Sequence, residues 1–445
     1  MGVSLAFAKA QARAGSPYGL GPSASLPDRP SRLRRGSTGN ALQRTTPVPP
    51  NRLLKNLAIL SSKTYFKRDI SPERTATMRG DNPSQGFVFS FVSPEQRVPE
   101  NHPLRAIKAM ADKILIGLSD TFSEMYSRTG RPSIPPESLL KSMILISLYS
   151  IRSDRLFCET LNYNILFRWF LDMNIDGTTF DHSVFSKNRD RLLEHEVAQQ
   201  FFFNVVQYAR QHALLSDEHF TVDGTLIEAW ASLKSFKRKT DECVQRADDD
   251  PGNPTVNFHG DKRSNQTHQS TTDPEARLAR KGRITAARLC FTGHVLMENR
   301  NGLCMDIAVA QASGTAERDS ARQQIERQWQ RGKRQIKTIG ADKGYYTREF
   351  VKFLRKHKIK PHIAVPDGKR VPGIDGRTTQ RASYQVSQQK RKRVEEIFGW
   401  LKTVGGLRKA RLRGTALNQL MAHISAASYN LIRMAKLLPL PAVAT

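Results

Sequence analysis

The hydrophobic pattern of this 445-residue chain changes its period near residue 220, and no other feature of the sequence constrains the fold as strongly. Between residues 101 and 215, apolar side chains recur at helical spacing, and the last two helices are expected around 156–170 and 183–193. From residue 220 onward, short apolar segments alternate with helical ones, as in an α/β fold. The sequence therefore predicts an all-α domain over residues 78–215 and an α/β domain with a mixed sheet over residues 216–438.

The elements expected in the second half follow one another closely. Strands are predicted at 220–225, 288–299, 303–310, 336–342 and 362–365. Helices are predicted at 317–330, 347–356, 390–404 and 418–438. Residues 234–284 are polar and contain several turn dipeptides, which predicts an insertion after the first strand. A short tail, residues 439–445, completes the chain.

The charge of the chain indicates what kind of partner it binds. Lys and Arg number 70 and Asp and Glu 41, which gives a net charge of +29 and favours a polyanion such as DNA. The longest apolar stretch is much shorter than the ~20 residues that a membrane span needs. The four cysteines form no Cys-x-x-Cys pair, so neither a disulfide scaffold nor a zinc ribbon is expected. We expect a cytoplasmic, nucleoid-associated protein that binds double-stranded DNA and no membrane.

Residues 1–77 differ in composition from the rest of the chain. They contain 13 Lys and Arg against 3 Asp and Glu, and they are rich in Pro, Ser and Gly. A segment of this composition buries too little apolar surface to fold. We expect a disordered basic extension, with the native product starting at Met78.

One predicted helix, residues 183–193, has the pattern of a helix that binds DNA. Apolar residues occupy one side, and the other is expected to carry Lys187, Asn188, Arg189 and Arg191. Lys and Arg bind phosphates and guanine, while Asn binds adenine. The alternative interpretation is a solvated helix face with no partner.

Two predicted strands end in an aspartate that has glycine nearby. Asp223 precedes Gly224, and Asp342 lies two residues before Gly344. Strand ends are where α/β folds place chemistry, and a glycine allows a ligand to approach closely. Mg²⁺ prefers carboxylate ligands, and a site for two metal ions needs a third acid. The alternative for each aspartate is an ordinary turn or cap residue.

The best source of the third acid is the helix predicted at 390–404. On a continuous helix, Glu395 shares a stripe with Arg391 and Lys402 and borders the apolar face, whereas Glu396 points away. Helical phase therefore favours Glu395. The alternative is a surface ion pair between Glu395 and its basic neighbours.

With these residues in place, the chain resembles bacterial insertion-sequence transposases of the DDE class. The likeness is carried by residues 220–230, 264–283, 339–346 and 390–413 and extends over about 78–438. The Arg-x3-Glu-x6-Lys signature of the class appears as Arg391, Glu395 and Lys402. The tyrosine usual three residues before the arginine is replaced by Gln388, and no role is carried onto Tyr384.

The resemblance implies an RNase H-like catalytic core. It implies that Asp223, Asp342 and Glu395 are catalytic and hold two Mg²⁺ ions, or Mn²⁺ in their place. Arg391, Lys402 and Lys343 would hold DNA phosphates beside them. The activity implied is cutting of element ends and joining to target DNA, by a protein that is a homo-oligomer when bound to DNA.

Two alternatives remain open at this stage. A nuclease of the same fold without strand transfer would use the same active-site chemistry. A catalytically silent DNA-binding remnant of a transposase would retain the fold and the charge.

Overall fold

The protein is described here from a computed structural model, which describes residues 93–126, 133–239, 256–258, 261–282, 285–332, 336–366, 368, 374 and 376–438. The predicted basic extension, residues 1–77, lies outside the described residues, as does the tail 439–445.

The first part of the described chain is helical, as predicted. Its helices are α2 (Pro94–Arg97), α3 (Pro103–Ile116), α4 (Ser119–Met125), α5 (Pro136–Leu148), α6 (Asp154–Tyr163), α7 (Ile165–Phe170), α8 (His182–Glu194) and α9 (Val197–Gln211). The helix expected at 156–170 is divided at Asn164, whose side chain accepts a hydrogen bond from the Phe167 amide (3.0 Å) and so caps α7.

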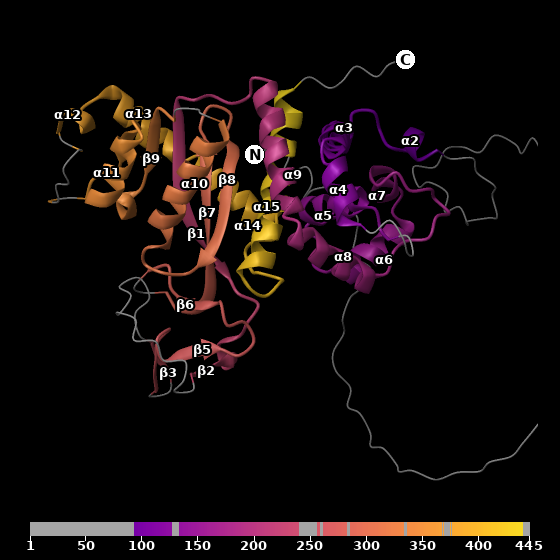
Figure 1. Ribbon diagram of the computed structural model, residues 1–445, viewed down its shortest axis with the longest axis horizontal. Coiled ribbons are helices and arrows are strands. Elements are labelled where there is room, and N and C mark those ends of the chain that lie inside the picture. The colour runs from indigo at the N-terminus through magenta and orange to yellow at the C-terminus, as the bar shows by residue number, and fades with distance from the viewer. Residues whose placement is uncertain are drawn as a thin grey trace, which may run out of the picture. The chain divides into compact units, whose positions relative to one another are not determined.

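A mixed sheet forms the centre of the second part (Figure 1). Its main strands are β1 (His219–Glu228), β7 (Arg288–Glu298), β8 (Leu303–Gln311), β9 (Thr338–Ala341) and β10 (Lys360–Ile363). β7 pairs antiparallel with both β1 and β8, whereas β1, β9 and β10 run parallel. The short β6 (Arg277–Ala279) pairs with the start of β7. This arrangement confirms the predicted α/β class and the RNase H-like mixed sheet.

Helices flank this sheet. They are α10 (Ala316–Gly332), α11 (Arg348–Lys356), α12 (Gly376–Thr379), α13 (Ala382–Arg391), α14 (Val394–Thr403) and α15 (Thr415–Leu437). α10 contacts β1, β7 and β8, while α13 contacts β1, β9 and β10. The amphipathic α11 joins β9 to β10 and buries Phe350, Val351 and Leu354.

The final helix, α15, packs along the edge of β8 that does not pair with β7. The Asn430 amide exchanges two hydrogen bonds of 2.8 Å with the main chain of Cys304. Gln419 accepts from the Val309 amide (2.6 Å) and donates to the Ile307 carbonyl oxygen (2.9 Å). These side chains satisfy backbone groups that an edge strand otherwise leaves unpaired. Because α15 also contacts α3, α5 and α9, it joins the helical part to the sheet in one hydrophobic core.

The insertion contains small strands that its sequence did not predict. β2 (Phe236–Arg238) pairs with β5 (His268–Ser270), and β3 (Val256–Phe258) pairs with β4 (Asp261–Arg263). Three residues a strand are too few to produce a visible alternation of polar and apolar residues. Residues 240–255 of the insertion lie outside the described part of the chain.

Three predicted boundaries near the acids are wrong. β1 continues to Glu228, so Asp223 lies inside the strand instead of ending it. The strand expected at 336–342 is shorter, and Asp342 caps the 3-10 helix η3 (Lys343–Tyr345). The helix expected at 390–404 is two helices, because α13 ends at Arg391 and α14 begins at Val394.

The domain boundary predicted at residue 215 remains a prediction, since the described helices and the sheet share one core. Within the described ranges, no helix combines the length and the apolar character required to span a membrane.

Candidate active site

Asp223 and Asp342 come from neighbouring parallel strands of the sheet. In the register of β1 and β9, Thr221 lies opposite Gly340, two residues before each aspartate. Parallel strands advance together and their side chains alternate with a period of two. The register therefore brings Asp223 and Asp342 to adjacent positions on one face.

Asp223 is held in an environment that disfavours its charge. Its Oδ1 accepts a hydrogen bond from the Gly224 amide (2.8 Å). Burial raises the pKa of Asp223 to about 6, the negative charges of Asp342 and Glu395 act in the same direction, and the positive charge of Arg391 opposes them. Asp342, Glu395 and Arg391 thus all lie within electrostatic reach of one carboxylate.

Asp342 lies in a tight turn at the end of β9. Its Oδ1 accepts from the Gly344 amide (2.8 Å), which makes it the N-cap of η3. Tyr345 in the same turn is 1% exposed. Burial raises the pKa of Tyr345 well above its ordinary value, and the charges of Glu317, Asp223 and Asp342 add to this effect. The phenol therefore lies within electrostatic reach of these three carboxylates.

Glu395 and Glu396 face different surroundings at the start of α14. Glu396 lies 4.0 Å from Arg393 Nε and 3.7 Å from Arg433, a residue of α15. Glu395 is exposed, and its charge contributes to the raised pKa of Asp223. Although the predicted continuous helix is interrupted, Glu395 is the member of this pair on the side of the aspartates.

Arg391 is brought to the site by close packing of α13 on the sheet. A Cβ atom at Gly340 would lie 3.3 Å from Ser387 Oγ and 3.5 Å from Arg391 Cβ. The glycine thus lets the end of α13 approach β9. Two polar residues earlier in α13 also hold it there, because Tyr384 Oη donates to the Ile363 carbonyl oxygen (3.0 Å) and Gln388 Nε2 to that of His362 (2.5 Å).

A fourth acid, Glu317, was missed by the sequence analysis. It lies in the first turn of α10. Burial raises the pKa of Glu317 to about 7, and the charges of Asp342 and Asp223 contribute further. The only sequence signal was an acid at a helix N-terminus, which is where an acid stabilises any helix.

The four acids supply the kind of ligand that a hard divalent cation prefers, but they are not arranged as a complete metal-binding site. Within the described residues, no three His, Cys, Asp or Glu side chains stand close enough together to hold a metal ion. All four are oxygen ligands of the kind that Mg²⁺ prefers. The raised pKa values of Asp223 and Glu317 reflect burial and mutual repulsion, which a bound cation would offset.

Two known protein families match parts of this chain. A transposase domain (DUF772) matches residues 92–191, and a transposase DDE domain matches residues 262–431. The chain is a DDE-type transposase. Asp342 and Glu395 lie inside the matched DDE segment, whereas Asp223 lies between the two matched segments.

Solved structures of other transposases are similar to this one at low identity. A piggyBac transposase synaptic complex with hairpin DNA has 12% identity and a TM-score of 0.35, over 76% of each chain. A pre-cleavage Mos1 transpososome has 12% identity and a TM-score of 0.18, over 70% of this chain and 82% of that one. A Mos1 mariner paired end complex with Mn has 12% identity and a TM-score of 0.17, over 80% of each chain. No curated protein matches the sequence of this transposase.

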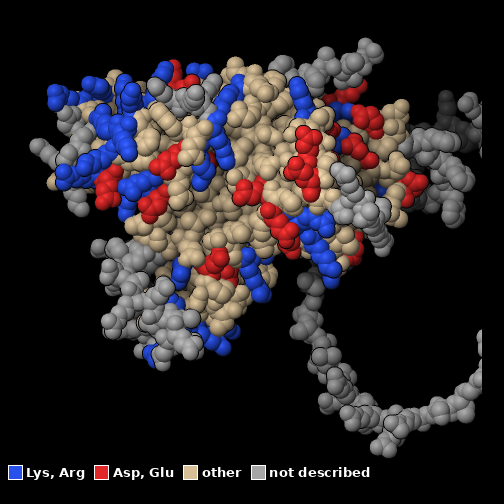
Figure 2. Space-filling model, viewed as in Figure 1, with Lys and Arg blue, Asp and Glu red and all other residues tan. Residues whose placement is uncertain are grey.

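The predicted phosphate-binding lysines of the transposase lie in different surroundings. Lys343 is exposed beside Asp342. Burial lowers the pKa of Lys402, and the positive charges of Lys281 and Arg408 lower it further. Lys402 therefore belongs to a group of cations toward the Glu228 end of β1, where the Glu228 amide donates to the Arg408 carbonyl oxygen (3.2 Å). Figure 2 shows further Lys and Arg side chains gathered over α11, α12 and α13.

The structure corrects the predicted DNA-binding face of α8. Asn188 is 5% exposed and Arg189 is 9% exposed, so neither faces solvent. Arg189 donates to Asp154 Oδ2 (2.6 Å) in α6, and Asn188 donates to the Val184 carbonyl oxygen (2.9 Å). Arg189 thus connects α8 to α6, and Asn188 also accepts a hydrogen bond from Oγ of Ser133 (2.9 Å), which precedes α5.

The other two α8 residues differ in exposure. The guanidinium of Arg191 is half-buried and lies over the Tyr126 ring, 4.8 Å from its centroid. Lys187 is the exposed member of the four. A DNA-binding role for this helix remains a prediction. Of the four residues named for it, only Lys187 is exposed enough to contact DNA.

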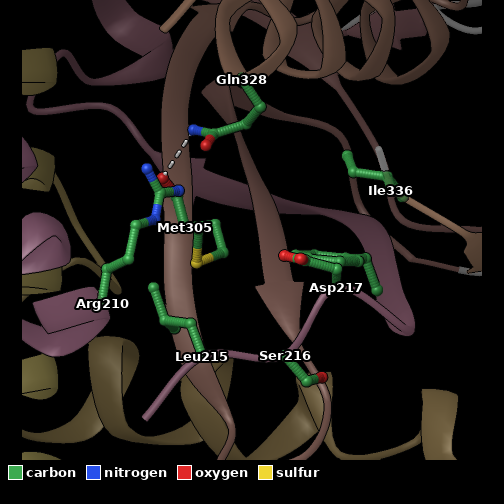
Figure 3. Close-up of a pocket in the computed structure, with 8 residues that line it drawn as sticks. Arg210, Leu215, Ser216, Asp217, Met305, Gln328 and Ile336 are labelled. Carbon is green, nitrogen blue, oxygen red and sulfur yellow. Dashed lines mark hydrogen bonds between the residues drawn. The ribbon is translucent and has the colours of Figure 1, made fainter. Parts of the chain in front are cut away.

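A pocket between β1, β8 and α10 is separate from the acids. Phe220, Met305 and Gln328 are among the residues that line it (Figure 3). The Gln328 side chain points to the main chain of Met305, and its Nε2 donates to the Met305 carbonyl oxygen (3.1 Å). None of the four acids lines this pocket, so it is not part of the candidate active site.

Proposed function

We propose that this transposase cuts the ends of a DNA element and joins them to target DNA by metal-dependent phosphoryl transfer. The observation that supports the proposal most is the gathering of Asp223, Asp342 and Glu395 near the end of β9, where the charges of Asp342 and Glu395 both raise the pKa of Asp223. Carboxylates are ligands that divalent cations prefer, and a chain of net charge +29 favours a polyanionic substrate.

The roles of the residues follow from their positions. Asp223, Asp342 and Glu395 would hold two divalent ions, Mg²⁺ or Mn²⁺. When bound, such ions activate an attacking oxygen and stabilise the leaving oxygen of an in-line displacement. Arg391 is the cation that acts on Asp223. Its planar guanidinium would orient the scissile phosphate by two parallel hydrogen bonds.

The remaining cations would bind DNA phosphates farther from the reacting phosphate. Lys343 stands beside Asp342, and Lys402 lies two helical turns beyond Glu395 near Lys281 and Arg408. A homo-oligomer assembled on paired ends would place two such sites on one element.

The test is a cleavage and joining assay with full-length protein and DNA that flanks its own gene. We expect Mg²⁺-dependent nicking at the element ends and transfer of pre-cut ends into a plasmid. Asp342→Asn should abolish both reactions. Glu349→Gln is the matched control, because Glu349 lies in α11 shortly after Asp342 and is 85% exposed.

Each other result separates the alternatives. Cutting without joining would favour a nuclease that lacks strand transfer. Binding without either reaction at any metal concentration would indicate a silent remnant. Cleavage that persists in Asp342→Asn would overturn the assignment of the site.

A further inference from the structure

Glu317 occupies a space that two glycines leave open. A Cβ atom at Gly224 would lie 3.0 Å from Glu317 Oε1, and a Cβ atom at Gly344 would lie 3.5 Å from Glu317 Oε2. The second of these positions is also 3.1 Å from Asp342 Oδ1. Each glycine lies within two residues of a predicted catalytic aspartate, so the Glu317 carboxylate lies near both segments that carry them.

A buried histidine points into the same space. His294 lies opposite Gly224 in the register of β1 and β7 and is 1% exposed. Neither of its ring nitrogens has a hydrogen-bond partner among the described residues. Its Nδ1 lies 3.1 Å from the Cβ position at Gly224, the same point that lies 3.0 Å from Glu317 Oε1. Buried polar groups without partners are uncommon, which makes this one informative.

The ordinary role of an acid at a helix N-terminus does not explain these observations. Asp319 lies in the same turn of α10, is half exposed, and pairs with Arg322 at 3.7 Å. Glu317 instead turns toward other carboxylates. The adjacent Arg318 donates to the Gly344 carbonyl oxygen (3.2 Å). Stabilising the helix requires neither burial nor like charges nearby.

We propose that Glu317 is a fourth carboxylate ligand of the divalent-cation site, and that His294, on β7, orients the Glu317 carboxylate through Nδ1. This inference rests on the proposed function, because it assigns a further ligand to the same site. Side chains alternate along β1, so Gly224 and Asp223 face opposite sides of the sheet. Glu317 lies against Gly224, and its Oε2 also faces the Asp342 turn beyond the end of β9, where β1 no longer pairs with β9. Glu317 would reach the cation past this turn, and Glu395 would reach it from α14.

The roles of the two residues differ. The oxygens of Glu317 would contact the cation directly. His294 would contact no substrate. It would act as a positioning residue by donating a hydrogen bond from Nδ1 to the Glu317 carboxylate when the cation is bound, a bond that His294 does not make in this structure. Hydrogen-bonded neighbours of metal ligands commonly change metal affinity by about 10- to 100-fold.

The test is a calorimetric titration of the full chain with Mn²⁺ alone, without DNA. We expect Glu317→Gln to weaken Mn²⁺ binding by about tenfold or more, with a smaller loss in His294→Gln. Asp319→Asn is the matched control, since it removes a charge from the same helical turn, and it should bind Mn²⁺ as the wild type does. Melting curves in EDTA establish that each variant is folded.

A second variant moves the ligand and leaves Glu317 in the sequence. Gly224→Ala places a methyl group 3.0 Å from Glu317 Oε1, and the backbone there needs no left-handed conformation. We expect it to weaken Mn²⁺ binding as well.

The outcomes separate this inference from the proposed function. Wild-type affinity in both Glu317→Gln and Gly224→Ala would overturn the inference and leave the proposed function standing. Absence of Mn²⁺ binding by the wild type, or binding indifferent to Asp342→Asn, would overturn the metal site itself.

Discussion

The acids at the sheet edge and the polar residues of α8 have opposite surroundings. In α8, Arg189 pairs with Asp154 at 2.6 Å, and Asn188 bonds the main chain of its own helix. At the sheet edge, Asp223 and Glu317 have other carboxylates as neighbours, and burial with repulsion raises their pKa values to about 6 and about 7.

The contrast shows how a buried polar residue can be interpreted. A buried group with matched partners contributes to stability and specifies how helices pack. Like charges held together in a half-buried cluster reduce stability, and such arrangements occur where chemistry requires them. The predictions below test this division between a structural region and a functional one.

The largest expected effect is that of removing an acid on activity. We expect Asp223→Ala to lower the DNA cleavage rate by at least about 10³-fold, as loss of a catalytic group commonly does. DNA affinity should change by less than about threefold, because phosphate neutralisation is spread over many Lys and Arg side chains. Single-turnover cleavage and equilibrium binding measure the two quantities. An equal loss of binding would place Asp223 with the structural residues.

The second prediction concerns the buried arginine of α8. Arg189→Ala should lower the free energy of unfolding by about 2 kcal/mol, because it removes a charge-assisted hydrogen bond and leaves Asp154 without its partner. Preference for element ends over scrambled DNA should stay unchanged. Lys187→Ala is the control and should change stability by less than about 0.5 kcal/mol. Lost preference in a fully stable Arg189→Ala protein would contradict the structural interpretation of α8.

The third prediction is a pH dependence of stability in EDTA. Below about pH 4, Asp223 is protonated in both the folded and the unfolded chain and has no effect. Between about pH 4 and pH 6 the unfolded chain loses this proton first, since the folded pKa is raised to about 6. The Asp223 contribution therefore lowers the free energy of unfolding as the pH rises through this window.

Replacing Asp223 by a neutral residue should abolish this pH-dependent decrease in the free energy of unfolding. We expect metal-free Asp223→Asn to be more stable than the wild type at pH 8 by about 2–3 kcal/mol, because the pKa of Asp223 is raised from 3.8 to about 6 and each pKa unit corresponds to about 1.4 kcal/mol. The difference should be smaller at pH 5. Thermal melting at the two pH values measures it, and a variant less stable than the wild type at pH 8 would show that Asp223 is structurally favourable.

The smallest expected effect concerns the salt dependence of DNA binding. Replacing one phosphate-binding lysine should reduce the slope of log affinity against log salt by about 1 and weaken all sequences alike. We expect this of Lys402→Ala, and of Lys187→Ala if the exposed side of α8 also contacts DNA. An unchanged slope in Lys187→Ala together with a reduced one in Lys402→Ala would confine DNA contacts to the sheet region.

Elements that depend on local pattern were predicted well. The periodicity of apolar residues identified the helical first part, the β7 and β8 hairpin and the helices α10 and α11 to within a few residues. Boundaries that depend on neighbouring elements were not predicted. β1 continues past Asp223 because it pairs with β7 as far as Glu228, and nothing in the sequence of β1 indicates that pairing.

The candidate site was predictable in part for the same reason. The sequence by itself determined the fold class and the charge that favours DNA, because residue type and local spacing suffice for each. It also predicted the carboxylates at 223, 342 and 395 as the candidate site, which remains a prediction. Only the tertiary structure decided that Asn188 and Arg189 face inward, and that Glu317 lies near two glycines with His294 beside one of them. Those outcomes depend on which distant segments pack together, and packing partners that lie tens of residues away leave no periodic signal in either segment.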